Sequence, residues 1–156
     1  MQEKKRIKDS ETEHVQILTQ GTLNGYKRLF GGKLMEWIDI TAAVVARRHS
    51  GKNVTTAFID SLSFEAPAYA NDTVVLKGHI TYTGNTSMEI CVKTYVENLN
   101  CDLRLINTAY VIMVALDENE KPTKVPGIIL ETEEEINEWK LAEQRKILRK
   151  TRISCQ

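Results

Sequence analysis

The spacing of hydrophobic positions changes once along the chain, from a helical period to an alternating one. Between Gly31 and about Arg48, apolar residues recur at intervals of three and four, which predicts an amphipathic helix that stops at Gly51. The apolar residues of this pattern are Leu34, Trp37, Ile38, Ala42, Val45 and Ala46. Small side chains at positions 42 and 43 indicate close packing against another element, which we expect to be a sheet.

Alternating apolar positions predict four long strands after this helix, at 54–64, 73–83, 88–96 and 106–116. In the first of them, one face is expected to carry Val54, Thr56, Phe58, Asp60, Leu62 and Phe64. Turn-like stretches separate the four strands, and connections this short favour antiparallel pairing. A shorter strand is predicted before the helix, at 14–19.

One long helix followed by four regular strands favours an α+β fold in which an antiparallel sheet wraps a central helix. A C-terminal helix is predicted over residues 131–152. Its first turn is acidic and its end is basic, the order that a helix dipole favours, and we expect the basic end to be solvated. Residues 1–11 are expected to be a flexible lead-in, and the whole chain, 1–156, to be a single domain.

Composition excludes several classes of protein. The 21 basic side chains balance the 21 acidic ones, so no overall field attracts nucleic acid or an anionic membrane. No apolar stretch is long enough to span a bilayer, and the first ten residues lack the apolar core of a secretory signal. Cys91, Cys101 and Cys155 are odd in number and form no CxxC pair, which argues against a disulfide framework or a zinc site. We therefore expect a cytoplasmic protein without membrane insertion, nucleic-acid partner or metal.

The strongest candidates for chemistry lie in the stretch from Asn24 to Asp39. Gly31 and Gly32 open the predicted helix, so other groups can approach its first N–H donors and an oxyanion can be received there. Asp39 lies two turns further on, inside the apolar pattern, where a carboxylate faces water, has a partner or does chemistry. Each of these residues also has a purely structural interpretation. Asp39 would be a solvated acid, Asn24 would be a turn residue in the dipeptide Asn24-Gly25, and Gly31 and Gly32 would allow close packing.

Several motifs occur in order: N-x(5)-F-G-G-x-L-M-x-x-x-D from Asn24 to Asp39, V-T-T-A at 54–57, F-x-x-P at 64–67 and G-x-T-S-M-E at 84–89. Together they resemble the hot-dog-fold acyl-CoA thioesterases over residues 12–150, in the branch of the bacterial broad-range and brain-type cytosolic acyl-CoA hydrolases. Relatives usually read D-x-N-x-x-G before the glycine pair, whereas this chain has Thr22 and Lys27 in place of the aspartate and the glycine.

The resemblance implies a hot-dog fold and hydrolysis of acyl-CoA to a fatty acid and CoA. Asp39 would act as general base or as nucleophile, Asn24 would orient the water or the thioester carbonyl, and the Gly31 and Gly32 N–H groups would polarise that carbonyl. The expected contacts to CoA are Gly84, Asn85, Thr86, Ser87 and Arg48, although the first four also suit an ordinary hairpin turn. No cofactor is expected, because CoA is part of the substrate.

Helix geometry bears on the assembly. At a rise of 1.5 Å per residue, Asp39 lies about 12 Å along the axis from Gly31, whereas contacts to one carbonyl need about 3 Å. We therefore expect a homodimer whose sites combine the Asn24 and glycine end of one subunit with Asp39 of the other, with assembly into a trimer of dimers left open. The alternative is a non-catalytic acyl-CoA-binding or regulatory module. A dehydratase is disfavoured because the helix has no histidine before His49, and a serine hydrolase because there is no GxSxG motif.

Overall fold

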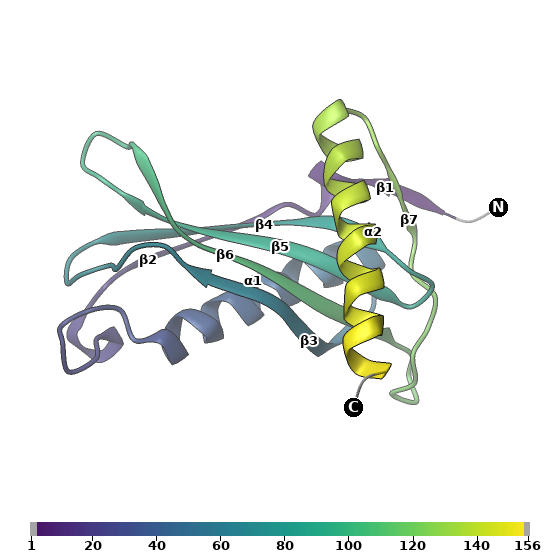
Figure 1. The fold of residues 1–156 in the computed structure, drawn as a ribbon, viewed down its shortest axis with the longest axis horizontal. Coiled ribbons are helices and arrows are strands. Elements are labelled where there is room, and N and C mark those ends of the chain that lie inside the picture. Colours follow the sequence, from purple (N-terminus) through teal and green to yellow (C-terminus); the bar gives the residue numbers. More distant parts are fainter. Residues whose placement is uncertain (1–2, 155–156) are drawn as a thin grey trace.

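The computed structural model describes residues 3–154, and its centre is a five-stranded antiparallel sheet with a helix on each face (Figure 1). The strand order is β2-β4-β5-β6-β3. The strands are β2 (Thr12–Ile17), β3 (Asn53–Phe64), β4 (Thr73–Thr83), β5 (Ser87–Glu97) and β6 (Leu103–Leu116). Helix α1 (Gly31–Ser50) packs on one face, and helix α2 (Glu133–Ser154) crosses the other. This arrangement confirms the predicted α+β hot-dog fold with a C-terminal helix. No helix in the described residues is long and apolar enough to cross a membrane.

Helix α1 buries the face that its apolar period predicts. Leu34, Ile38 and Val45 are each at most 1% exposed. The sheet comes very close at Gly78 of β4, where a Cβ atom would lie 3.0 Å from Thr41 Cγ2 and 3.1 Å from Val45 Cγ2. The helix ends as predicted at Gly51, which has a φ of 68° and donates its N–H to the Arg47 carbonyl.

Strand β3 departs from the regular alternation expected of it. Its pairing with β6 is interrupted twice, between Thr56 and Phe58 and between Ile59 and Ser61. Thr56 and Leu62 pair with Met113 and Ala109, which are buried under α1, whereas Asp60 is bonded to α2 on the other face. The prediction that Phe58 and Asp60 share one face with Thr56 is therefore wrong, because each β-bulge inserts a residue and reverses the alternation.

Part of residues 1–11, for which a flexible lead-in is expected from the sequence, forms regular secondary structure. Strand β1 (Lys4–Arg6) pairs in parallel with β7 (Gly127–Ile129), and a 3₁₀ turn follows at Ile7–Asp9. Ile7 and Ser10 are 3% and 1% exposed, because this segment packs over the end of β4. Residues 1 and 2 of the lead-in lie outside the described residues, as do Cys155 and Gln156 at the other end.

Helix α2 is fixed to the sheet by charged groups. Arg145 makes two hydrogen bonds, of 2.7 and 3.1 Å, to the carboxylate of Glu89 on β5, and Glu89 is 2% exposed. Arg149 bonds Asp60 of β3 at 3.1 Å. The basic end of α2 is therefore not simply solvated, as expected from sequence, because two of its cations neutralise buried acids.

Candidate active site

The carboxylate of Asp39 is held by a hydroxyl from the edge strand. Asp39 is half-buried on α1, and its Oδ1 accepts a hydrogen bond of 2.5 Å from Thr56 Oγ1 on β3. Thr56 also lies 3.5 Å from Met113 Sδ, which fixes its side chain on the α1 face of the sheet. Because the hydroxyl donates, it stabilises and orients an ionised carboxylate.

The second predicted catalytic residue, Asn24, lies in a tight loop before α1. Its Oδ1 accepts hydrogen bonds from the backbone N–H groups of Tyr26 at 2.9 Å and Arg28 at 3.2 Å. Within residues 3–154, its Nδ2 has no hydrogen-bond acceptor, so the amide can donate to a ligand. Lys27 has a φ of 59°, a left-handed conformation that explains why relatives usually carry glycine at this position. The lysine keeps the turn that presents the amide.

The start of α1 supplies free backbone donors. Phe30 is the N-cap and makes no side-chain capping bond, and the first turn contains no acidic residue. The positive end of the helix dipole is thus left unneutralised by the described residues. A Cβ atom on Gly32 would lie 2.7 Å from Phe30 Cε1, so a side chain there would require the exposed Phe30 ring to shift.

A cavity of about 370 Å³ adjoins this helix start. Asn24 lines it together with Leu34 of the first turn and Phe64 at the end of β3. The other lining residues are Arg28, Leu29, Glu65, Ala66, Pro67, Ala68 and Ile106. Asp39 is not among them. Within one chain, Asn24 and the first-turn residue Leu34 line one cavity, whereas neither the glycine pair nor Asp39 lines it.

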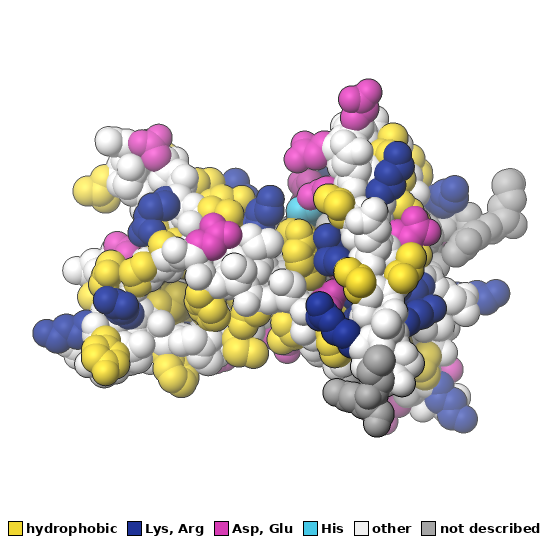
Figure 2. Space-filling model, viewed as in Figure 1, with side chains coloured by type: hydrophobic (Ala, Val, Ile, Leu, Met, Phe, Trp, Pro, Cys, Tyr) yellow, Lys and Arg dark blue, Asp and Glu magenta, His cyan; other side chains and the backbone are white. Residues whose placement is uncertain are grey.

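Exposed apolar side chains lie on α1 and along β3. Met35 and Ile40 on α1 are 39% and 45% exposed, and Phe58 and Phe64 on β3 are 38% and 56% exposed. Figure 2 shows hydrophobic side chains gathered along the sheet edge that β3 forms. An edge strand of twelve residues with apolar neighbours presents both unpaired backbone groups and a hydrophobic surface.

The predicted CoA contacts are divided between two places. Gly84, Asn85, Thr86 and Ser87 form the turn from β4 to β5, in which the Gly84 N–H donates to the Ser87 carbonyl at 2.9 Å. Lys146 of α2 reaches this turn, since a Cβ atom on Gly84 would lie 3.1 Å from its Nζ. Arg48 is elsewhere and donates to the Glu11 carbonyl and to Thr12 Oγ1, which ties the end of α1 to β2. The approach of Lys146 depends on how α2 crosses the sheet, which its sequence does not specify.

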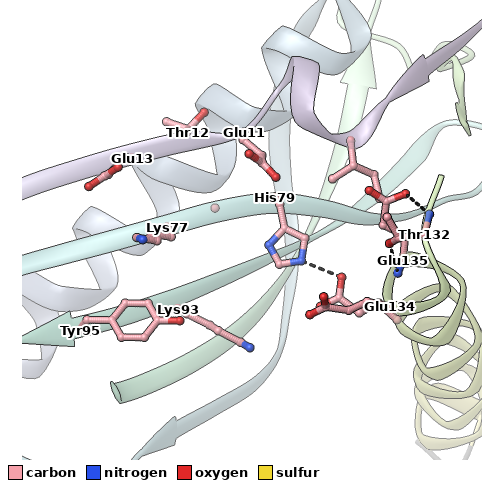
Figure 3. A pocket seen from close by; sticks show the side chains of 13 residues that line it. Glu11, Thr12, Glu13, Lys77, His79, Lys93, Tyr95, Thr132, Glu134 and Glu135 are labelled. Atoms are coloured by element: carbon pink, nitrogen blue, oxygen red, sulfur yellow. Dashed lines mark hydrogen bonds and ion pairs between the residues drawn. The ribbon is translucent and has the colours of Figure 1, made fainter. Parts of the chain in front are cut away.

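A larger cavity, of about 660 Å³, lies between the sheet and the N-terminal part of α2. Figure 3 shows His79 in it, with Lys77 and Lys93 of the sheet on one side and Glu134 and Glu135 of α2 on the other. His79 Nε2 lies 2.9 Å from Glu138 Oε2, and Cys91 is the cross-strand neighbour of His79. This grouping is not an activated nucleophile, because burial raises the pKa of the Cys91 thiol to about 12.

Comparison with known proteins identifies the family. The profile of the Thioesterase superfamily matches residues 26–101. The uncharacterized acyl-CoA thioester hydrolase YkhA of Bacillus subtilis is 43% identical over 130 residues, which cover 83% of this chain and 76% of YkhA. The chain belongs to the acyl-CoA thioesterase family. We therefore describe it as an acyl-CoA thioester hydrolase.

Solved structures of acyl-CoA thioesterases match the whole fold. A hexameric acyl-CoA thioesterase is 35% identical with a TM-score of 0.94, and the match covers 99% of both chains. The acyl-CoA hydrolase of Staphylococcus aureus, solved with butyryl coenzyme A, coenzyme A and coenzyme A disulfide, is 33% identical with a TM-score of 0.90, over 95% of this chain and 91% of that one. Variants of the Staphylococcus enzyme with an asparagine, an aspartate or a threonine changed to alanine have also been solved.

Proposed function

We propose that this thioesterase hydrolyses acyl-CoA to a fatty acid and CoA at two equivalent sites, each completed across a homodimer. Asp39 of one subunit faces Asn24 and the Gly31 and Gly32 N–H groups of the other. The observation that carries this proposal is the oriented carboxylate of Asp39, bonded to Thr56 at 2.5 Å, on the same helix as an uncapped start that it cannot reach.

The chemistry follows from the groups that meet at each proposed site, which are the start of α1 with Asn24 from one subunit and Asp39 from the other. Developing negative charge on the thioester oxygen is stabilised by the free N–H donors and the unneutralised dipole of α1. Asp39 either removes a proton from the attacking water or attacks the carbonyl carbon itself. In both routes the C–S bond breaks and CoA leaves as a thiolate that takes up a proton derived from water. In the second route the acyl group is first held on Asp39 as an anhydride, which water then hydrolyses to release the fatty acid. The Asn24 amide, through Nδ2, donates to the carbonyl or orients the water.

Residue spacing in a relative supports the assignment of three side chains. In the Staphylococcus variants, the replaced asparagine, aspartate and threonine are separated by 15 and 17 positions. Asn24, Asp39 and Thr56 have these same separations. A shared spacing over a matching fold argues that the three residues are equivalent in the two enzymes. We therefore add Thr56 to the site, as the residue that orients the carboxylate.

The proposed dimer rests on the edge of the sheet. We propose that pairing of β3 with its copy satisfies the unpaired backbone groups of both strands and buries exposed apolar side chains of α1 and β3. The acyl-CoA thioesterase with a TM-score of 0.94 is described as hexameric, and assembly of three such dimers is consistent with it. The apolar cavity beside Asn24 is a suitable place for the acyl chain.

CoA is anionic, and its phosphates need N–H groups, hydroxyls and cations. We propose that the Gly84–Ser87 turn contributes the Thr86 and Ser87 hydroxyls and that Lys146 supplies a positive charge beside them. Arg48 remains a candidate, although its guanidinium already bonds the start of β2.

The experiment that tests this function measures CoA release from a panel of acyl-CoA esters. Asp39→Asn keeps the shape of the side chain and should lower kcat by about 10²- to 10⁴-fold, the usual contribution of a general base, while CoA binding is retained. Glu36→Gln is the matched control, because Glu36 is an exposed acid on the same helix, paired with Lys33, and its change should leave kcat unaltered. An Asp39→Asn enzyme with wild-type turnover would refute the proposal.

A further inference from the structure

The two interruptions in β3 place consecutive functional groups on opposite faces of the sheet. In a regular strand, Thr56 and Asp60 would point to the same side. Here the bulge after Thr56 reverses the alternation, so Thr56 bonds Asp39 on the α1 side and Asp60 bonds Arg149 on the α2 side. β-Bulges that re-aim side chains in this way are frequent next to active sites.

Asp60 is an unusual residue for an edge strand because its carboxylate is buried. Its side chain is 7% exposed, and it is neutralised by Arg149, whose side chain is 13% exposed, at 3.1 Å. Arg152 lies 4.0 Å from the other carboxylate oxygen but is largely exposed. A buried ion pair with a charged hydrogen bond holds the strand at this point, where the second bulge removes a regular cross-strand partner.

Helix α2 has its own attachment to the middle of the sheet. Arg145 makes its paired bonds to buried Glu89 of β5 and lies 3.8 Å from the ring centre of Tyr110 on β6. Trp139 packs on Tyr82 of β4 with ring centres 4.3 Å apart. The helix is thus anchored on the central strands and reaches Asp60 of the edge strand through Arg149 and, more distantly, Arg152, so that its position can be transmitted to β3.

We propose that Asp60 and Arg149 are positioning residues for the carboxylate of Asp39. By fixing the second bulge from the α2 side, the ion pair fixes the short segment 57–59 and with it the direction of the Thr56 hydroxyl. The inference rests on the proposed function, since it assumes that Asp39 does the chemistry. Helix α2 thereby acquires a role in catalysis, although neither Asp60 nor Arg149 contacts the carboxylate of Asp39.

The test is a double-mutant cycle of kcat at saturating acyl-CoA, well below the melting temperature of each variant. Thr56→Val should lower kcat by about 10-fold or more, as loss of a charged hydrogen bond predicts. Asp60→Asn should lower kcat by about 3- to 10-fold with little change in KM. Because Asp60 acts through Thr56, the double variant should be no slower than Thr56→Val alone, and its effects should be strongly non-additive.

Two further variants keep the test independent of folding. Glu138→Gln removes another ion pair of α2, the one to His79 on β4, and should leave kcat unchanged. If Asp60→Asn does not fold, Arg149→Lys replaces it in the test. Lysine keeps the positive charge but not the planar guanidinium geometry, so kcat should fall, by less than in Asp60→Asn. Wild-type kcat in Asp60→Asn, or losses that multiply in the double variant, would overturn the inference. Turnover in Asp39→Asn would instead overturn the proposed function on which it rests.

Discussion

Replacement of Thr56 by valine isolates the hydrogen bond on which the orientation of Asp39 depends. Valine keeps the branched shape and removes the hydroxyl, and with it the hydrogen bond to Asp39 Oδ1 and the weaker contact of 3.5 Å with Met113 Sδ. A hydrogen bond to a charged group contributes about 1.5–3 kcal/mol. If the bond is needed in the transition state, kcat should fall by about 10- to 100-fold, since 1.36 kcal/mol corresponds to a factor of ten. The free energy of unfolding should change by less than about 1 kcal/mol, because water can reach the half-buried carboxylate.

The assay follows the thiol of released CoA with a thiol-reactive chromophore under saturating substrate. Thr55→Val is the matched control, since Thr55 is the adjacent residue, pairs with Val114 and is exposed. It should retain wild-type kcat. Equal losses in the two variants, or a Thr56→Val enzyme with full activity, would refute the assignment of Thr56 as the residue that orients the base.

Three further predictions concern assembly, strain and pH. Ile40→Glu puts a charge on the exposed apolar surface of α1 that the proposed dimer would bury. Light scattering should therefore detect monomers, and activity should fall in proportion to the fraction of monomer. Lys27→Gly removes a left-handed lysine and should raise the free energy of unfolding by about 0.5–1 kcal/mol, measured by urea titration. Burial lowers the pKa of His49 in the folded protein. As the pH falls, its imidazole is therefore protonated in the unfolded chain before it is protonated in the folded one. Stability should therefore fall as the pH drops below the ordinary value of 6.5, by at most about 1.4 kcal/mol per pH unit. His49→Gln should reduce that slope, and an unchanged slope would show that His49 does not titrate as the structure predicts.

Sequence periodicity predicted the main elements because each is set by local physics. The apolar stripe of α1, its stop at Gly51 and the four alternating strands needed no knowledge of the partners they pack against. Spacing alone also separated Gly31 from Asp39, which led to the expectation of two half-sites. The same local reasoning could not give the bulges of β3, because these arise from its register with β6.

The side-chain contacts that sequence reasoning missed, inside and outside the proposed site, join residues far apart in the chain. Thr56 lies in a motif noted in the sequence, but its bond to Asp39 appears only when β3 packs beside α1. His79 has no acid near it in the chain, yet α2 brings Glu138 to 2.9 Å from its ring. Arg149 and its partner are 89 positions apart. Such pairs follow from the path of α2 over the sheet, which charge order alone does not determine.

The most direct test of the central claim mixes two inactive variants, Asn24→Ala and Asp39→Ala, after unfolding and refolding them together. If each site takes one residue from each subunit, half of the randomly formed dimers are mixed, and each mixed dimer has one intact site. The mixture should then recover about a quarter of the wild-type activity, as follows from the two-fold symmetry of the dimer. If Asn24 and Asp39 of the same chain served one site, every site would lack a residue. A refolded, dimeric mixture without activity would contradict the account.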